Sequence, residues 1–386
     1  MPTFSRRLDL LPPYLQGEIP RIKRELRARG IDVIDLGAGD ADLAPPPAAV
    51  EVLREAVQDP VNSRYAFQQG LPAFREEIAR FMERRFGVTV DPHRELALLV
   101  GSKDGIFHLP ITLLDPGDVA IIPDPGYQPY LGGTVLAGGT PYLVPLRAEN
   151  DFLVPVEQIP ADVARAAKLL YLNYPNNPTT SIASREYLER VVDFCRRNDI
   201  VLAFDNAYSE LGFDGYKAPS ILEIPGARDV AVEFFSMSKT YNMTGWRIGW
   251  VAGNADIISA LVQVKGLSDT GAPLFVQHAA AAALASHDQW FPGNRDTFRR
   301  RRDAAVAQLQ EGGWEIEAPE STMYLWIPLP DDQPSQPFAQ RLLQEEGVAV
   351  LPGSALGAAG EGFFRIALTA SEERLREAAR RIGSAP

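Results

Sequence analysis

The chain has 386 residues, and its 38 Lys plus Arg against 50 Asp plus Glu give a formal net charge of −12. Apolar residues make up 46% and charged residues 23%, as in ordinary globular proteins, and the acidic balance argues against nucleic acid or an anionic membrane as the main partner. The single cysteine, Cys195, excludes an internal disulfide and a thiolate zinc cluster, and the four histidines form no H-E-x-x-H pair. No apolar run reaches the roughly 18 residues that span a bilayer, and the first residues lack the apolar core of a secretory signal. We therefore expect a cytoplasmic protein of enzyme size without a bound metal.

The first 90 residues predict helices around one short strand. An amphipathic helix is expected over 18–30, ending at Gly30, followed by a strand and a glycine turn in VIDLGAGD (33–40). Two further helices are expected over 47–57 and 72–87, with Gly87 ending the second.

The middle of the chain predicts a buried parallel sheet. Short apolar runs alternate with helices, among them a helix over 186–198 that buries Cys195 as a small apolar thiol. Such runs are typical of strands covered on both faces, so the fold class is α/β with a mostly parallel, seven-stranded sheet. The seven strands are expected at 96–100, 119–123, 141–144, 168–174, 200–208, 230–236 and 248–253. The phosphate-loop pattern G-x-x-x-x-G-K-[ST] and the dinucleotide pattern G-x-G-x-x-G after a strand are both missing.

From about residue 290 the pattern changes to a smaller α+β unit. Helices are expected over 290–313, 335–347 and 371–383, and strands over 314–318, 323–329, 348–353 and 363–369. We expect a small domain of residues 1–47 and 290–386 and a large domain of residues 48–289. The run Arg299–Arg302 is interpreted as a solvated helix face, because four consecutive helical residues point in different directions and form no patch.

The segment SMSKTYNMTGWRIGW (236–250) carries the strongest chemical signal. It places Lys239 between two hydroxyl residues and Arg247 eight positions later. Asp205 ends a buried strand, and Asn177 closely follows another. Because the carboxyl ends of parallel strands line the ligand crevice, we expect these groups at one edge of the sheet. A buried carboxylate such as Asp205 requires a cationic or hydrogen-bonding partner.

These segments resemble the class I/II aminotransferases, which are pyridoxal-phosphate (PLP) enzymes of fold type I. The resemblance runs from LPPYLQGEIPRIK through VIDLGAGDADL, VGSKDGIFHL, PDPGYQPYLGG, NYPNNPT, DNAYSE and SMSKTYNMTGWRIGW to FFRIALTAS, which is nearly the whole chain. Within the family, VGSKDGI, DPGYQPY, LAGG and FDGYKAPS are most similar to the bacterial LL-diaminopimelate aminotransferase branch. The resemblance implies a large PLP-binding domain and a homodimer.

The resemblance also assigns roles around the cofactor ring. Lys239 matches the lysine that forms the Schiff base with the cofactor aldehyde, and whose free amine then moves the substrate proton. Asp205 matches the acid that pairs with the pyridine nitrogen, which makes the ring a better electron sink. Tyr208 and Asn177 match donors to the phenolate oxygen. Taken alone, Asn177 is equally a turn residue before Pro178.

The cofactor phosphate needs fixed donors. The resemblance assigns this role to Ser102 and Lys103 at the start of a helix, and to Ser236, Ser238 and Arg247. Tyr127 matches the aromatic ring that stacks on the cofactor. Without the resemblance, Ser102 is a simple N-cap and Tyr127 a core or turn aromatic.

Substrate contacts follow in the same way. Arg365 lies in an otherwise apolar strand and requires an anionic partner, and it matches the arginine that binds the substrate α-carboxylate. Gly39 and Asn177 match contacts near the same carboxylate. Tyr65 matches the tyrosine that reaches the phosphate of the neighbouring subunit's cofactor, which makes the dimer necessary for function.

The loop RYAFQQG departs from the diaminopimelate branch, which tends to carry Tyr-Pro-Ser-Tyr-Glu-Gly there. Ala66, Phe67, Gln68 and Gln69 remove an acidic residue suited to the distal ammonium of diaminopimelate. The stretch 264–275 contains no arginine for a second carboxylate, although Lys103 is available for that role.

The expected reaction is ping-pong transfer of an amino group from an L-amino acid, LL-diaminopimelate or a related one, to a 2-oxo acid such as 2-oxoglutarate or pyruvate. The alternatives are a PLP-dependent β-lyase, because the same cofactor contacts support elimination, and a regulatory module on the same fold. The regulatory alternative is disfavoured because no basic helix-turn-helix extension is present and Lys239 is retained.

Overall fold

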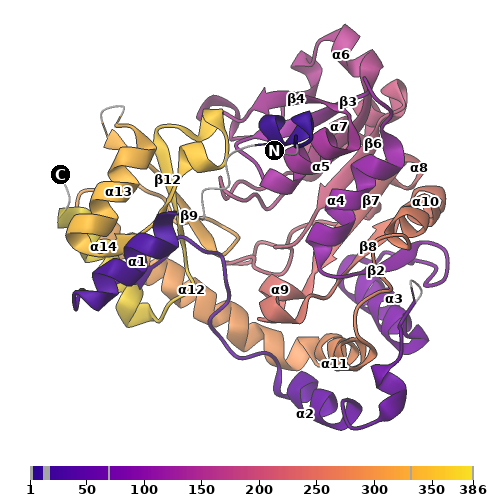
Figure 1. Cartoon of the computed structure of the whole chain (residues 1–386), viewed down its shortest axis with the longest axis horizontal. Coiled ribbons are helices and arrows are strands. Elements are labelled where there is room, and N and C mark those ends of the chain that lie inside the picture. The colour runs from indigo at the N-terminus through magenta and orange to yellow at the C-terminus, as the bar shows by residue number, and fades with distance from the viewer. Residues whose placement is uncertain (1–2, 12–17, 68–69, 331–332, 385–386) are drawn as a thin grey trace.

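The computed structural model describes residues 3–11, 18–67, 70–330 and 333–384. Gln68 and Gln69 of the RYAFQQG loop and part of the LPPYLQGEIPRIK motif lie outside the described residues. Figure 1 shows the large sheet at the right of the view and β9, β12, α13 and α14 grouped at the left, with α12 running from this group toward α11. Among the described residues, no helix is long and apolar enough to cross a membrane.

The large sheet has seven strands in the order β2-β8-β7-β6-β5-β3-β4. Strand β8 runs antiparallel to both of its neighbours, and the remaining pairs are parallel. All seven predicted strands are confirmed: β2 (Leu96–Leu99), β3 (Val119–Asp124), β4 (Thr140–Pro145), β5 (Ala167–Leu172), β6 (Val201–Asp205), β7 (Ala231–Ser236) and β8 (Gly249–Gly253).

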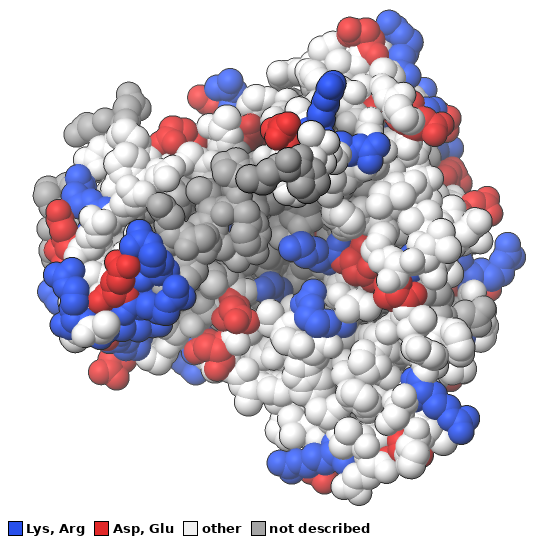
Figure 2. All heavy atoms as spheres, in the orientation of Figure 1, with Lys and Arg blue, Asp and Glu red and all other residues white. Residues whose placement is uncertain are grey.

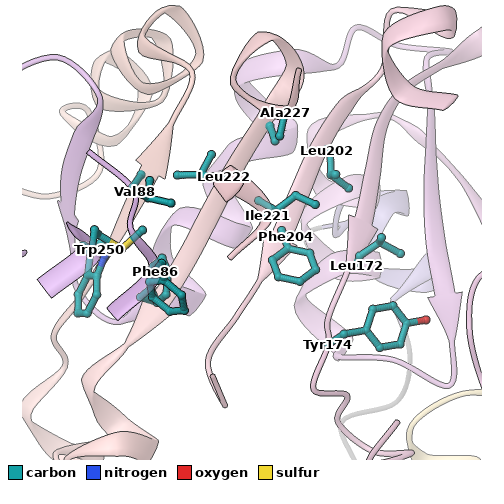
Figure 3. Packing of buried hydrophobic residues seen from close by; sticks show 14 of the residues in the cluster. Phe86, Val88, Leu172, Tyr174, Leu202, Phe204, Ile221, Leu222, Ala227 and Trp250 are labelled. Atoms are coloured by element: carbon teal, nitrogen blue, oxygen red, sulfur yellow. The ribbon is translucent and has the colours of Figure 1, made fainter. Parts of the chain in front are cut away.

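In all of these strands except the edge strand β4, alternate residues enter two different cores, which explains their nearly continuous apolar runs. On β6, for example, Leu202 and Phe204 face the core shown in Figure 3, whereas Ala203 faces the opposite one. Asp205 lies two residues after Ala203, so its side chain points to the same face of the sheet. That face carries Tyr130. The sequence alternation thus decides which side of the sheet receives the carboxylate.

Helices cover both faces of the sheet. The core shared with Leu202 contains residues of α2 (Pro47–Ala56), α3 (Pro72–Phe86), α7 (Arg185–Asn198) and α11 (Leu274–Ala285). The opposite core contains residues of α4 (Ser102–Leu113), α5 (Gln128–Ala137) and α10 (Ala255–Lys265). Shorter helices are α6 (Ala161–Ala166), α8 (Ala227–Val230) and α9 (Met237–Thr240). Cys195 is buried in α7, as predicted, and burial raises the pKa of its thiol.

The small unit is built on the three-stranded antiparallel sheet β11-β12-β9, formed by β9 (Tyr324–Pro328), β11 (Leu351–Pro352) and β12 (Phe363–Ala367). Its helices are α1 (Glu18–Ala28), α12 (His287–Glu311), α13 (Ser335–Glu346) and α14 (Glu372–Ser384). The strand predicted over 348–353 is divided in two. Its first half, β10 (Val348–Ala349), pairs in parallel with β1 (Ile34–Asp35), and only β11 joins β12.

Two predictions for this unit are wrong. The segment 314–318 forms no strand, although its alternation is real: Trp314 and Ile316 pack against the small-unit core while Glu315 and Glu317 are exposed. Alternation reports which side chains face inward, and this segment lacks the neighbouring strand that would complete a ladder. The second error concerns Arg299–Arg302.

Only part of the Arg299–Arg302 run is a solvated face. Arg299 and Arg300 are about half exposed, but the side chains of Arg301 and Arg302 are only 5% and 4% exposed. Arg301 makes a two-pronged ion pair with Asp42 at 2.7 and 2.8 Å, and Arg302 pairs with Asp214 at 2.7 Å. Arg302 also pairs with its neighbour Asp303 at 2.6 Å, but Asp42 and Asp214 come from distant segments, so no local pattern around the arginines indicated them.

Candidate active site

The reacting groups predicted from the sequence meet where β5, β6 and β7 end and the small unit approaches. Figure 2 shows a hollow near the centre of the displayed face, with Lys and Arg side chains beside it. Lys239 lies in α9, the short helix that follows β7, and its Nζ donates to the carbonyl oxygen of Gly39. The glycine turn after β1 therefore lies directly against the lysine.

Asp205 is buried at the end of β6 with an incomplete set of partners. Its Oδ2 accepts from the Tyr130 hydroxyl at 2.8 Å, and its main-chain oxygen accepts from Asn173 Nδ2 at 2.6 Å. Its Oδ1 is buried and has no hydrogen-bond partner among the described residues. Burial raises the pKa of Asp205 to about 6, against the opposing effects of hydrogen bonds from the Tyr130 hydroxyl and the Ala207 main chain. One oxygen of this carboxylate and its negative charge are therefore available to bind a cation.

Arg365 is 5% exposed and faces the same region from β12. Its Nη1 donates to Asn177 Oδ1 at 2.5 Å and its Nη2 to the Gly37 carbonyl at 2.9 Å, while its Nε has no partner among the residues that the structure describes. Within the described chain, its hydrogen-bond partners are neutral oxygens and no carboxylate pairs with it. A buried guanidinium in this condition favours an anion from outside the chain.

The predicted phosphate contacts come from two helix starts and one arginine. Ser102 is the first residue of α4, and Gly101 before it has φ 78°, so this chain reversal favours glycine. A Cβ on Gly101 would lie 2.5 Å from Arg247 Nη2, which shows how closely the guanidinium covers this turn. Ser236 caps α9 by accepting from the Ser238 amide at 3.2 Å. The hydroxyls of Ser102 and Ser236, the main-chain amides at these two helix starts and the Arg247 guanidinium together form the cradle proposed for a phosphate.

The remaining predicted residues differ in how far one chain positions them. Tyr127 precedes α5, and its half-buried ring packs edge-on against Tyr130 with centroids 5.6 Å apart. Tyr208 is buried, with its hydroxyl 3.2 Å from that of Tyr324. Lys103 is exposed beside Ser102, and Tyr65 is 72% exposed. Within the described chain, neither Lys103 nor Tyr65 is hydrogen-bonded to the other predicted site residues.

Sequence reasoning missed three residues that hold the site together. Tyr130 and Asn173 bind Asp205, and Tyr324 joins Tyr208, with its ring 4.1 Å beneath the Arg365 guanidinium. The signals were present but weak: Asn173 follows a buried strand, and Tyr130 lies one helical turn after Tyr127. Across the described residues, no group of three His, Cys, Asp or Glu side chains could hold a metal ion.

Comparisons with known proteins agree with this geometry. The family profile described as "Aminotransferase class I and II" matches residues 31–382. The LL-diaminopimelate aminotransferase of Desulforudis audaxviator is 47% identical over 378 residues, covering 98% of this chain and 96% of that protein. The solved structure of substrate-bound BacF from Bacillus subtilis has a TM-score of 0.95 at 35% identity and covers 100% of this chain and 98% of that one. A probable N-succinyldiaminopimelate aminotransferase of Thermus thermophilus has a TM-score of 0.91 at 38% identity, covering 96% and 99% of the two chains.

The chain therefore belongs to the class I and II aminotransferases, enzymes of PLP fold type I that depend on pyridoxal 5′-phosphate. Its residues fit that cofactor on observations independent of the family. The unpaired Asp205 Oδ1 suits a protonated ring nitrogen, and the cradle at Gly101 and Arg247 suits a phosphate dianion. Lys239 supplies a primary amine that an aldehyde requires.

Proposed function

We propose that this aminotransferase moves an amino group from an L-amino acid to a 2-oxo acid, either 2-oxoglutarate or pyruvate, in two successive half-reactions at one site. The observation that carries the proposal is the buried Asp205, whose unpaired oxygen and raised pKa call for a cation that the described chain does not provide. A protonated pyridine nitrogen is a cation of the required kind.

The cofactor, when bound, withdraws the electron pair left behind when the substrate loses its α-proton. In the proposal, Asp205 keeps the ring nitrogen protonated, and Tyr130 and Asn173 hold Asp205 in place. Tyr208 and Asn177 donate to the phenolate oxygen. The Lys239 amine binds the cofactor aldehyde in the resting enzyme and, once released, carries the proton from the substrate α-carbon.

The phosphate is proposed to bind Ser102, Lys103, Ser236, Ser238 and Arg247, with Tyr127 stacked on the ring. Tyr65 of each chain is proposed to reach the cofactor phosphate of the neighbouring subunit. Its 72% exposure in a single chain supports that assignment, because a large aromatic side chain at this position is available to a second copy. The homodimer is accordingly part of the proposal, and so is a cytoplasmic location.

Arg365 is proposed to bind the substrate α-carboxylate through its two terminal nitrogens, with Asn177 and Gly39 beside it. Its burial without a carboxylate partner in the described chain supports this role. Transamination is favoured over β-elimination because the Desulforudis and Thermus relatives are both named aminotransferases.

The donor is proposed to be LL-diaminopimelate or a related amino acid. Support comes from relatives named LL-diaminopimelate aminotransferase, including that of Aquifex aeolicus at 45% identity. Ala66 and Phe67, which stand in the loop where the branch tends to carry an acidic residue, favour a smaller or less cationic side chain. We also propose a small domain of residues 1–47 and 290–386 and a large domain of residues 48–289.

The test is a product assay on the purified enzyme loaded with cofactor. Each of a panel of L-amino acids, including LL-diaminopimelate, is incubated with 2-oxoglutarate or pyruvate. Transamination forms one new amino acid per 2-oxo acid consumed and releases no ammonia. Ammonia release without an acceptor would instead identify the β-lyase.

A further inference from the structure

Two buried phenols meet where the small unit contacts the cofactor-binding strands. Tyr324, the first residue of β9, and Tyr208, three residues after β6, have their hydroxyl oxygens 3.2 Å apart. Their rings are tilted by 71° with centroids 5.6 Å apart, and their exposures are 2% and 5%. The proposed function assigns a role to Tyr208 but none to Tyr324.

Counting protons decides the direction of this hydrogen bond in the loaded enzyme. A phenol has one proton to donate, and from the geometry alone either hydroxyl could be the donor. If Tyr208 donates its proton to the phenolate oxygen of the cofactor, its own oxygen can only accept from its neighbour. Tyr324 is then the donor to Tyr208.

We propose that Tyr324 is a positioning residue, which donates to Tyr208 and so keeps the Tyr208 proton directed at the cofactor. This inference rests on the proposed function. It adds a contact from the small unit to the hydrogen bonds that control the charge on the cofactor's phenolate oxygen.

The surroundings of Tyr324 favour it as the donor. The Arg365 guanidinium lies 4.1 Å from the centre of its ring, and Lys239 lies nearby. Burial raises the pKa of Tyr324, but the positive charges of Lys239 and Arg365, together with the hydrogen bond to Tyr208, hold it below its ordinary value. A more acidic phenol is the stronger hydrogen-bond donor.

Burial, by contrast, raises the pKa of Tyr208, and the neighbouring Tyr324 and the negative charge of Asp205 at the end of β6 act in the same direction, against the positive charge of Arg365. Tyr127, which precedes α5, and Tyr130 in that helix are further titratable groups beside the pair, and burial raises the pKa of each. Arg365 lowers the pKa of both phenols, whereas Lys239 lowers that of Tyr324 and Asp205 raises that of Tyr208, which leaves Tyr324 the more acidic of the two.

The position of Tyr324 is fixed from both sides. A Cβ on Gly39 would overlap the Tyr324 hydroxyl, so the glycine turn packs against it as closely as backbone allows. The carbonyl of the same Gly39 accepts from Lys239 Nζ. Any displacement of β9 relative to the large sheet would therefore change the hydrogen bond to Tyr208.

A second role for Tyr324 must be separated from this one. Its ring also supports Arg365, so removal of the whole side chain would weaken substrate binding without any effect through Tyr208. The substitution Tyr324→Phe keeps the ring and removes only the hydroxyl, whereas Tyr324→Leu removes both. We expect Y324F to leave the KM of the amino-acid donor within about twofold, and Y324L to raise it further.

The experiment is a pH titration of the visible absorbance of the cofactor-loaded enzyme, for the wild type, Y324F, Y208F and the double variant. A weaker hydrogen bond leaves more negative charge on the phenolate oxygen, which then holds the proton of the neighbouring nitrogen more tightly. The titration midpoint of Y324F should therefore rise by about 0.5–1 pH unit, less than that of Y208F. Because Tyr324 acts through Tyr208, the double variant should titrate like Y208F alone.

The matched control is Tyr142→Phe, a half-buried tyrosine on β4, which should leave the midpoint unchanged. A Y324F enzyme that titrates like the wild type overturns the inference, as does a double variant whose shift is the sum of the two single shifts. Either result leaves the proposed function standing. A wild-type protein that takes up no cofactor contradicts the proposed function itself, and the inference with it.

Discussion

The substitution Asp205→Asn should produce opposite effects on stability and on activity. In the cofactor-free protein the carboxylate is buried, one of its oxygens has no partner among the described residues, and its pKa rises from 3.8 to about 6. Because the folded-state value is the raised one, folding is penalised as pH rises through this range, and the penalty is complete above about pH 6. Two pKa units correspond to about 3 kcal/mol.

The uncharged amide of the Asp205→Asn variant escapes this penalty, so the stability difference between variant and wild type should move in favour of the variant as pH rises. Between about pH 4.5 and pH 8 the change should be about 2 kcal/mol. Any constant cost of the buried amide cancels in this comparison. In the loaded enzyme the same substitution removes the partner of the ring nitrogen and should lower kcat by about 10²-fold, equivalent to about 3 kcal/mol.

The assay is urea denaturation of both cofactor-free proteins across this pH range, with kcat measured on the loaded enzymes. Asp162→Asn, a change at an exposed site in α6, serves as the control. Its free energy of unfolding should differ from that of the wild type by the same amount at every pH. If the stability difference between Asp205→Asn and the wild type does not change with pH, burial does not raise the pKa of this carboxylate. The argument from its unpaired negative charge would then fail.

Three further predictions concern the arginines and a second buried acid. Arg365→Lys keeps the positive charge but loses the planar guanidinium that can make two parallel hydrogen bonds, and the KM of the amino-acid donor should rise by about 10²-fold. An unchanged KM would show that Arg365 does not bind the substrate carboxylate. Arg247→Gln should weaken cofactor binding by about tenfold or more, measured by titrating the cofactor-free enzyme, whereas Arg300→Gln on exposed α12 should leave binding as it is. Burial raises the pKa of Glu233 to about 8, against hydrogen bonds from Ser220 and Asn206, so folding is increasingly penalised as pH rises from about 4.5 to about 8. Glu233→Gln should therefore gain stability over the wild type across that range, and a gain that shrinks as pH rises would contradict the assignment.

The large sheet could be predicted well from the sequence because all of its strands except the edge strand β4 are covered on both faces. A run such as 119–123 is apolar without interruption, and between turns that pattern is typical of a buried strand. The segment 348–353 looks equally continuous, yet its two halves join different sheets. Strand partners are set by tertiary packing, which no local pattern contains.

The residues of the site likewise fall into two groups: those that the sequence could identify, and those whose importance comes from tertiary contacts. Lys239, Asp205 and Arg365 stand in segments whose residue order resembles a known family, so the sequence could name them. Tyr324 carries no such mark, since its importance comes from a 3.2 Å contact with a residue 116 positions away. Arg301 is similar, because the burial of its charge depends on Asp42, 259 positions earlier.

The most direct test of the central claim is a half-reaction without an acceptor. The purified enzyme, loaded with pyridoxal phosphate, is mixed with one L-amino acid donor, and the visible absorbance and the 2-oxo acid formed are recorded together. The proposed function predicts that the visible band disappears as one 2-oxo acid forms per active site, that a 2-oxo acid acceptor restores the band, and that Lys239→Ala shows neither change at a comparable rate. Continued product formation without an acceptor, or equal rates in the wild type and Lys239→Ala, would contradict it.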